Sequence, residues 1–238
     1  MSFSNMFVET VTSYGRDIDN LIVLIAVIVG FFWVICEGLF FYFIWRFRAR
    51  PGHESQYVAG TTKEENKWIT RTHNVVLLCD VVIVAFAISI WVNVKQTLPE
   101  PENAQLVRVV GQQWAWSFEH AGADGILENS EQHPNATDDN VWTVGELHLV
   151  KDQVYHFKLE SRDVNHSLSI PAFRLKQDAI PGRQITGWFQ PEKIGRYDFQ
   201  CAEMCGIGHG VMMAQVHVES PEDHAAWLAS HGSVAAND

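Results

Sequence analysis

The sequence predicts a membrane-anchored all-β protein, in which a two-helix transmembrane hairpin precedes a β-sandwich or barrel. Two long apolar segments near the N-terminus, at residues 21–45 and 75–92, predict the hairpin. Beyond residue 105 the chain changes to short runs rich in Val, Ile and aromatic residues, separated by Gly, Pro and Asp or Asn. Many short strands at near-regular spacing are typical of a sandwich or barrel.

Each apolar segment is long enough, or nearly so, to cross a hydrocarbon core of about 30 Å as a helix. The first contains one charge, Glu37, and the second contains one, Asp80. Buried helices of soluble proteins rarely sustain such runs without a polar face. A cleaved signal peptide is disfavoured, because the first run lacks a basic n-region and a small-residue cleavage site. We therefore expect a hairpin over residues 21–94.

The distribution of Lys and Arg predicts the orientation of the hairpin. The connecting loop, residues 46–74, contains six of them, whereas residues 1–20 contain only Arg16. The positive-inside rule places this loop in the cytoplasm, and both termini outside. Residues 93–238 contain 20 Asp and Glu against 10 Lys and Arg, a net charge of −10. This charge argues against nucleic acid as a partner and fits a surface that attracts a basic protein, or simply a soluble acidic surface.

The external part divides into a linker, a β domain and a tail. Residues 95–104 form a polar, Pro-containing linker, and residues 121–140 form a polar insertion with a glycosylation-type sequence at Asn135. Residues 220–238 form a tail that begins with a Ser-Pro-Glu-Asp capping pattern and predicts a short helix. The β domain covers residues 105–219, with strand-like runs at 105–120, 142–150, 153–161, 166–173, 183–190, 195–201 and 212–219.

The stretch "QCAEMCGIGHGVMMA", residues 200–214, contains the candidate metal ligands Cys201, Cys205, His209 and Met212. An external location permits a disulfide, but a disulfide leaves the histidine and methionine without a role. A thioether is a poor zinc ligand, whereas thiolate, imidazole and Met together select copper. A blue-copper site uses one cysteine, and this loop has two, each able to bridge.

Two thiolates that bridge two copper ions leave each ion in need of a further ligand. His209 supplies one, and His166 in "SRDVNHSLSIP" is the best candidate for the second imidazole. Met212 and the main-chain carbonyl of Glu203 are candidates for weak axial positions. The other external histidines have no partner spacing, and we expect ordinary surface or strand residues at positions 120, 133, 148, 156, 217, 224 and 231.

The stretch "CAEMCGIGHGVM" (201–212) resembles the Cys-x-Glu-x-Cys-Gly-x-x-His-x-x-Met motif of subunit II of the haem-copper cytochrome c oxidases. The stretches "GQQWAWSFE" (111–119), "DVNHS" (163–167) and "IPAFRLKQDAIPGR" (170–183) resemble other signature stretches of that family, in the same order. The resemblance covers essentially the whole chain and implies a helical hairpin that carries a cupredoxin-like Greek-key sandwich. It also implies a binuclear CuA centre, with ligands His166, Cys201, Glu203 (main-chain oxygen), Cys205, His209 and Met212.

The resemblance implies an electron-transfer role with no catalytic residue on this chain. Electrons pass from cytochrome c through the CuA centre to the haems of subunit I, which reduces oxygen to water. Trp114 is the implied electron acceptor, while Trp116 and Phe118, on the same predicted strand face, are expected in the core. The family's pattern places cytochrome c docking at Glu119 and Asp163, a magnesium ligand at Glu203, and the mouth of a proton channel at Glu65.

The implied partners are subunits I and III of the oxidase and a separate cytochrome c, in a bacterial inner membrane with the CuA domain in the periplasm. Because a carboxylate in lipid is costly, we expect Glu37 and Asp80 to face subunit I and seat the hairpin, with proton conduction as the alternative. Two other functions remain open: a CuA subunit of a nitric oxide reductase, and a membrane-anchored copper carrier. A quinol-oxidising relative is disfavoured because those subunits lack the copper ligands.

Overall fold

The computed structural model describes residues 8–52, 54, 57–100, 102, 104–127 and 139–232. The chain forms two compact units, one of residues 17–93 and the other of residues 1–16 together with residues 94–238. The glycosylation-type sequence at Asn135 lies outside the described residues.

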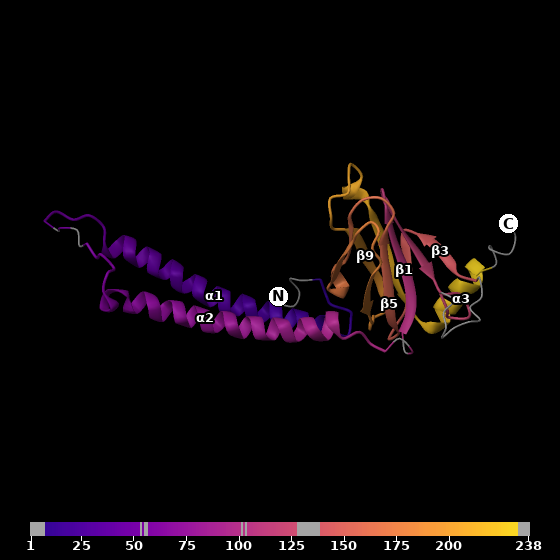
Figure 1. Ribbon diagram of the computed structural model, residues 1–238, viewed down its shortest axis with the longest axis horizontal. Helices are drawn as coiled ribbons and strands as arrows, with labels where there is room; N and C mark the ends of the chain where they lie inside the picture. The colour runs from indigo at the N-terminus through magenta and orange to yellow at the C-terminus, as the bar shows by residue number, and fades with distance from the viewer. Residues whose placement is uncertain are drawn as a thin grey trace. The chain divides into compact units, whose positions relative to one another are not determined.

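The first unit is a pair of long helices, α1 (Gly15–Arg46) and α2 (Lys63–Trp91), shown in Figure 1. Both are long and apolar enough to cross a membrane, which confirms the predicted two-helix hairpin. Helix α2 begins well before its apolar segment because Thr62 and Glu65 form a capping box. The Thr62 hydroxyl accepts the Glu65 N–H, and the Glu65 carboxylate accepts the Thr62 N–H. A π-helical turn, Val92–Gln96, follows α2.

The second unit is a β-sandwich of two five-stranded sheets (Figure 1). One sheet has the order β3-β2-β1-β5-β8 and the other β4-β10-β9-β6-β7. The chain crosses repeatedly between the sheets, which agrees with the predicted Greek-key sandwich. The strands are β1 (Ala104–Gln112), β2 (Ala115–His120), β3 (Val141–Val144), β4 (Glu146–Val150), β5 (Val154–Ser161), β6 (His166–Ile170), β7 (Leu175–Ala179), β8 (Ile185–Phe189), β9 (Gly195–Cys201) and β10 (Met213–Glu219).

Three strand predictions were incomplete. The run 105–120 is a hairpin of β1 and β2, because the chain turns at Gln113 and Trp114. The run 142–150 is broken at Gly145, whose φ of 80° is one that glycine adopts without a steric penalty. Strand β7 was not predicted at all, since "LKQDA" has few β-branched residues, and it forms by pairing with β6.

Aromatic side chains from both sheets form the core beside the metal ligands. Trp116 and Phe118 are fully buried and pack edge-on against Phe199, with ring centroids 5.0 and 5.3 Å apart. Their predicted core role is therefore confirmed. The expectation that Trp114 shares their strand face is wrong, because Trp114 lies in the β1–β2 turn and is 40% exposed.

Segments at the two ends of the chain pack on this β unit. Near the N-terminus, Val11 N–H donates to the Ala172 carbonyl (2.9 Å), and Tyr14 meets Trp188 edge-on at 5.1 Å. At the other end, helix α3 (Pro221–Gly232) lies where the sequence predicts a short helix. Its Trp227 packs against histidines of β2 and β4.

Candidate metal centre

The predicted ligands gather at one end of the inner strands of the second sheet. His166 is the first residue of β6, Cys201 is the last of β9, and Met212 directly precedes β10. Strand β9 runs antiparallel to both neighbours, so the start of β6, the end of β9 and the start of β10 lie together. Residues 202–212 form the loop that connects β9 to β10 at this end, and this loop contains Cys205 and His209.

The side-chain donors converge within this loop. The two sulfurs, Cys201 Sγ and Cys205 Sγ, are 3.7 Å apart. His166 Nδ1 lies 3.9 Å from Cys201 Sγ, while His209 Nδ1 and Met212 Sδ each lie 3.7 Å from Cys205 Sγ. The Glu203 carbonyl oxygen is 3.3 Å from Cys201 Sγ. The structure thus brings together all six donors that the motif predicts.

The donor set fits a thiophilic metal better than a disulfide. A sulfur separation of 3.7 Å far exceeds a bond of about 2.05 Å, and both cysteines are free and buried. Burial and the neighbouring Cys201 raise the pKa of the Cys205 thiol to about 11. Two thiolates therefore need a cation beside them, and two thiolates, two imidazoles and a buried thioether are soft donors that suit copper.

Asp163 fixes the orientation of His166. Its carboxylate accepts the His166 Nε2–H at 2.8 Å, which leaves Nδ1 with a lone pair facing Cys201. The same carboxylate accepts N–H groups from Gln113 and Val164, each at 2.6 Å. Partial burial opposes ionisation of Asp163, but these hydrogen bonds outweigh it and lower its pKa. Gly111 gives the imidazole room, since a Cβ there would lie 3.1 Å from the His166 ring.

Trp114 covers the metal loop from outside. Its Nε1–H donates to the Cys205 carbonyl at 3.2 Å, and Gln113 Nε2 donates to the same oxygen at 2.9 Å. The indole lies so close to the loop that a Cβ on Gly208 would be 2.5 Å from its ring atoms, and one on Gly206 would be 3.1 Å away. Trp114 therefore joins the protein surface to a ligand residue through direct contact.

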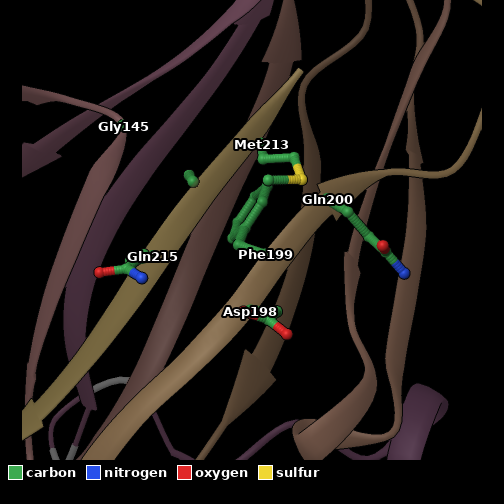
Figure 2. Close-up of a pocket in the computed structure, with 7 residues that line it drawn as sticks. Gly145, Asp198, Phe199, Gln200, Met213 and Gln215 are labelled. Carbon is green, nitrogen blue, oxygen red and sulfur yellow. The ribbon is translucent and has the colours of Figure 1, made fainter. Parts of the chain in front are cut away.

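The surface around the metal loop is unusually apolar. Four large apolar side chains in or next to the loop are exposed by more than half: Met204, Ile207, Val211 and Met213. Beside them the surface has a hollow of about 310 Å³ over the paired strands β9 and β10, lined by Asp198, Gln200, Met213 and Gln215 among others (Figure 2). Exposed apolar groups rimmed by polar ones are typical of protein interaction sites.

The two predicted docking acids have other contacts. Glu119 is only 8% exposed, and its carboxylate lies 3.4 Å from Arg108 and accepts a hydrogen bond from Asn140. Glu119 is thus a largely buried, paired carboxylate in this structure, and its role in docking stays a prediction. Asp163 is partly exposed, but its carboxylate holds His166 in place, a role that the sequence analysis missed. The spacing of three residues between Asp163 and His166 was the available signal.

The two remaining predicted acids are exposed. The carboxylate of Glu65 takes part in the α2 capping box, which gives it a structural role near the start of that helix. Glu203 is exposed in the metal loop, with its main-chain oxygen directed at Cys201. Helix residues Glu37 and Asp80 are also exposed on this single chain.

Five histidines that were expected to be ordinary residues form a second cluster, around Trp227 of α3. His148 stacks on the indole at 4.1 Å, and His120, His224 and His231 lie 5.0 to 5.2 Å from it. His217 stacks on His148 at 4.5 Å. No local spacing reveals this group, because it forms only when β2, β4, β10 and α3 pack together.

Comparisons with known proteins point to one family. Residues 105–219 match the family model described as cytochrome c oxidase subunit II, periplasmic domain. The chain is 32% identical to the alternative cytochrome c oxidase subunit 2 of Bradyrhizobium diazoefficiens, over 94% of this chain and 83% of that protein. It is 29% identical to cytochrome c oxidase subunit 2 of Cereibacter sphaeroides, over 86% and 72%. A similar solved structure is the periplasmic domain of cytochrome oxidase subunit II of Bradyrhizobium japonicum, with 24% identity and a TM-score of 0.48 over 58% of this chain and 99% of that one.

Proposed function

Because this chain belongs to the family of cytochrome c oxidase subunit II, we propose that it is the electron-accepting subunit of a respiratory oxidase that holds a binuclear CuA centre. In this proposal, electrons arrive from cytochrome c and leave to the haems of subunit I, where oxygen is reduced to water. The observation that carries the proposal is the convergence of two free thiols, two imidazoles and a thioether at the ends of β6, β9 and β10.

The ligands of the proposed centre are His166, Cys201, Cys205, His209 and Met212 by side chain, and Glu203 by its main-chain oxygen. Two copper ions held by these donors would supply a site that takes up one electron and spreads its charge over both ions. The protein's part is to hold the donors still. Asp163 fixes His166, and the Cys201 N–H donates to the Met212 carbonyl at 3.0 Å, which ties the two ends of the loop together. Rigid donors favour fast electron transfer, because little rearrangement accompanies the change of charge.

Trp114 is the proposed point at which electrons are taken up. Trp114 is partly exposed and also donates a hydrogen bond to the main chain of Cys205. The surrounding apolar side chains Met204, Ile207 and Val211 suit a partner protein that docks with little polar contact. The excess of acid over base in residues 93–238 favours a basic donor such as cytochrome c, with a rate that falls as ionic strength rises.

The loop also offers contacts for the partner subunit. Glu203 extends into solvent between the two cysteines, so its carboxylate is free to bind a magnesium ion together with ligands of subunit I.

Glu37 and Asp80 lie on helices whose apolar faces suit lipid or a partner, and we place them against subunit I. Glu65, near the cytoplasmic start of α2, is the proposed donor to a proton channel of subunit I. Subunit III is a further expected partner.

The N-terminal segment supports a shared location for the N-terminus and the β domain. Val11 and Tyr14 pack on that domain and precede α1 directly. A hairpin returns the chain to the same side of the membrane, so both lie on one face. The basic loop 46–74 argues that this face is the periplasmic side of a bacterial inner membrane.

Copper counting and spectroscopy on the full chain test the proposal. We expect two copper ions per chain and a mixed-valence electron paramagnetic resonance signal in the oxidised protein. Met212→Leu removes a buried donor and should alter that signal, whereas Met213→Leu, next to it but 65% exposed, should not. A single, readily exchanged copper would instead indicate a copper carrier and overturn the proposal.

Replacement of Trp114 by Phe tests the path of electron uptake. The phenyl ring loses the hydrogen bond to the Cys205 carbonyl, so reduction of the chain by cytochrome c should slow strongly while the copper spectrum stays the same. Trp142→Phe is a suitable control, because Trp142 is similarly exposed but lies on β3, away from the loop. An unchanged rate in the Trp114 variant would rule out this path.

A further inference from the structure

A second group of metal-binding side chains lies on strands β4 and β10, remote from the copper ligands. It consists of Glu146, His148 and His217, whose donor atoms all lie within 4.8 Å of one another. His217 is five residues along β10 from Met212, which corresponds to about 17 Å of extended strand. We propose that these three residues bind a divalent transition-metal ion, with Zn²⁺ as the best match.

Strand pairing places these donors side by side. Strands β4 and β10 run parallel, with His148 opposite His217 and Glu146 opposite Gln215. Side chains two residues apart share a face of the sheet, so Glu146 and His148 extend to the same side. The two imidazole rings are stacked, with centroids 4.5 Å apart and an angle of 9° between their planes. The sheet therefore fixes the positions of the two histidine backbones, but each nitrogen lone pair lies in its ring plane, so the half-buried His217 ring must rotate for both histidines to bind one ion.

Each histidine has a ring nitrogen available for a metal ion. His148 is only 5% exposed, and its Nδ1 is hydrogen-bonded to Glu219 Oε1 at 2.9 Å. Its Nε2 is buried without a hydrogen-bond partner and lies 3.6 Å from Glu146 Oε2. The Nε2 of His217 is buried without a hydrogen-bond partner as well. A buried polar nitrogen without a partner is destabilising, and metal coordination would give both nitrogens a partner.

The surrounding groups suit a cation. A carboxylate behind a ligating histidine is the usual outer partner of a zinc site, and Glu219 occupies that position behind His148. The indole of Trp227 stacks on His148 at 4.1 Å and holds its ring plane. Burial, His148 and Arg196, which lies opposite His217 on β9, lower the pKa of His217, whereas the carboxylates of Glu146 and Glu219 oppose this shift.

The donor set selects the kind of metal. Two imidazoles and one carboxylate suit Zn²⁺, whereas Mg²⁺ and Ca²⁺ prefer oxygen donors alone. Tetrahedral Zn²⁺ with bonds of about 2.0–2.1 Å needs donor atoms roughly 3.4 Å apart. His148 Nε2 and Glu146 Oε2 are already 3.6 Å apart, and since all three donors lie within 4.8 Å of one another, no pair must close by more than about 1.4 Å. The exposed Glu146 side chain is able to move, and His217 is only half-buried. Three protein ligands leave the fourth position to water, so we expect bound zinc to exchange.

Zinc titration of the full chain with its copper centre loaded tests the inference. We expect one zinc per chain in addition to copper, with no loss of copper. Glu146→Gln and His217→Gln should each weaken zinc binding at least tenfold, and Glu219→Gln, which removes the outer carboxylate, should weaken it about 10–100-fold. Calorimetry gives the affinity, and metal analysis gives both stoichiometries.

Matched controls separate this site from general zinc binding by surface residues. His231→Gln changes a histidine that also contacts Trp227 but lies outside the donor set, and Glu222→Gln changes an exposed acid at the start of α3. Both should bind zinc as the unchanged chain does, and thermal unfolding should show that every variant is folded. Absence of zinc binding, equal weakening in control and site variants, or zinc uptake matched by copper loss would each overturn the inference.

Discussion

Gly208 offers a sharp test of the contact between Trp114 and the metal loop. In the Gly208→Ala variant the new Cβ would lie 2.5 Å from Trp114 ring atoms, where ordinary contact requires at least 3.4 Å. The indole must therefore retreat by roughly 0.9 Å, the difference of these two distances. The backbone at Gly208, with φ −89° and ψ 7°, is accessible to alanine, so the effect comes from the clash and not from backbone strain.

The size of the effect follows from the cost of overpacking. An added methyl group in a tight contact costs about 1–3 kcal/mol. The exposed indole can relieve the clash by rotating away from the loop. The penalty therefore applies to the conformation in which the ring packs on the loop. A penalty of 1–3 kcal/mol lowers the population of that position by roughly 5- to 150-fold. We expect the rate of reduction by cytochrome c to fall within this range, while the copper spectrum is retained.

Stopped-flow reduction of the copper centre measures this rate. Gly210→Ala is the matched control, because a Cβ there has no atom within 4 Å, and this variant should keep the rate of the unchanged chain. Loss of the Trp114 hydrogen bond should also lower the unfolding temperature slightly in Gly208→Ala. If Gly208→Ala is reduced as fast as Gly210→Ala, then close packing of Trp114 on the loop is not required for electron uptake.

Three further predictions concern single side chains. Asp163→Asn removes the charge that orients His166, so copper retention against a chelator should weaken about 10–100-fold. Burial lowers the pKa of His120 to about 3; because the unfolded state binds a proton near pH 6.5, stability should fall as pH drops from 6.5 toward 3, and calorimetry should show a shallower fall in His120→Gln. Glu65→Gln preserves the capping box of α2, so it should leave stability unchanged but lower oxidase turnover, whereas Glu64→Gln should change neither; normal turnover in Glu65→Gln would exclude the proton-channel role.

The sequence predicted the architecture where one local signal dominated. The two apolar segments and the closely spaced ligands from Cys201 to Met212 are such signals, because hydropathy and ligand chemistry both act over short stretches. Strand boundaries were predicted less well. Gly145 breaks its run through a positive φ, which a single glycine within a strand-like run does not announce, and the turn at Trp114 interrupts a run of continuous composition, where the pairing of β1 with β2 decides where each strand ends.

The site was predicted through its ligands but not through the groups that hold them. Glu119 is assigned to docking only by the resemblance to the family, and no local signal predicts that Arg108 on the adjacent strand pairs with it and that it is largely buried. The cluster of His148 and His217 is likewise not predicted, because it also depends on contacts between strands. These residues are far apart in sequence and meet only through the parallel pairing of β4 with β10.

The positions of the ligand His166 and of Trp114 depend on the same short turn. Asp163 binds the His166 ring and also the main-chain N–H of Gln113, while Gln113 and Trp114 both donate to the Cys205 carbonyl. The β1–β2 turn is thus tied to His166 through Asp163 and to Cys205 directly. A change at Asp163 should therefore loosen both the copper ligand and the indole, whereas Gly208→Ala should displace the indole alone. Comparison of the two variants separates metal holding from electron uptake, since only the first should alter copper affinity.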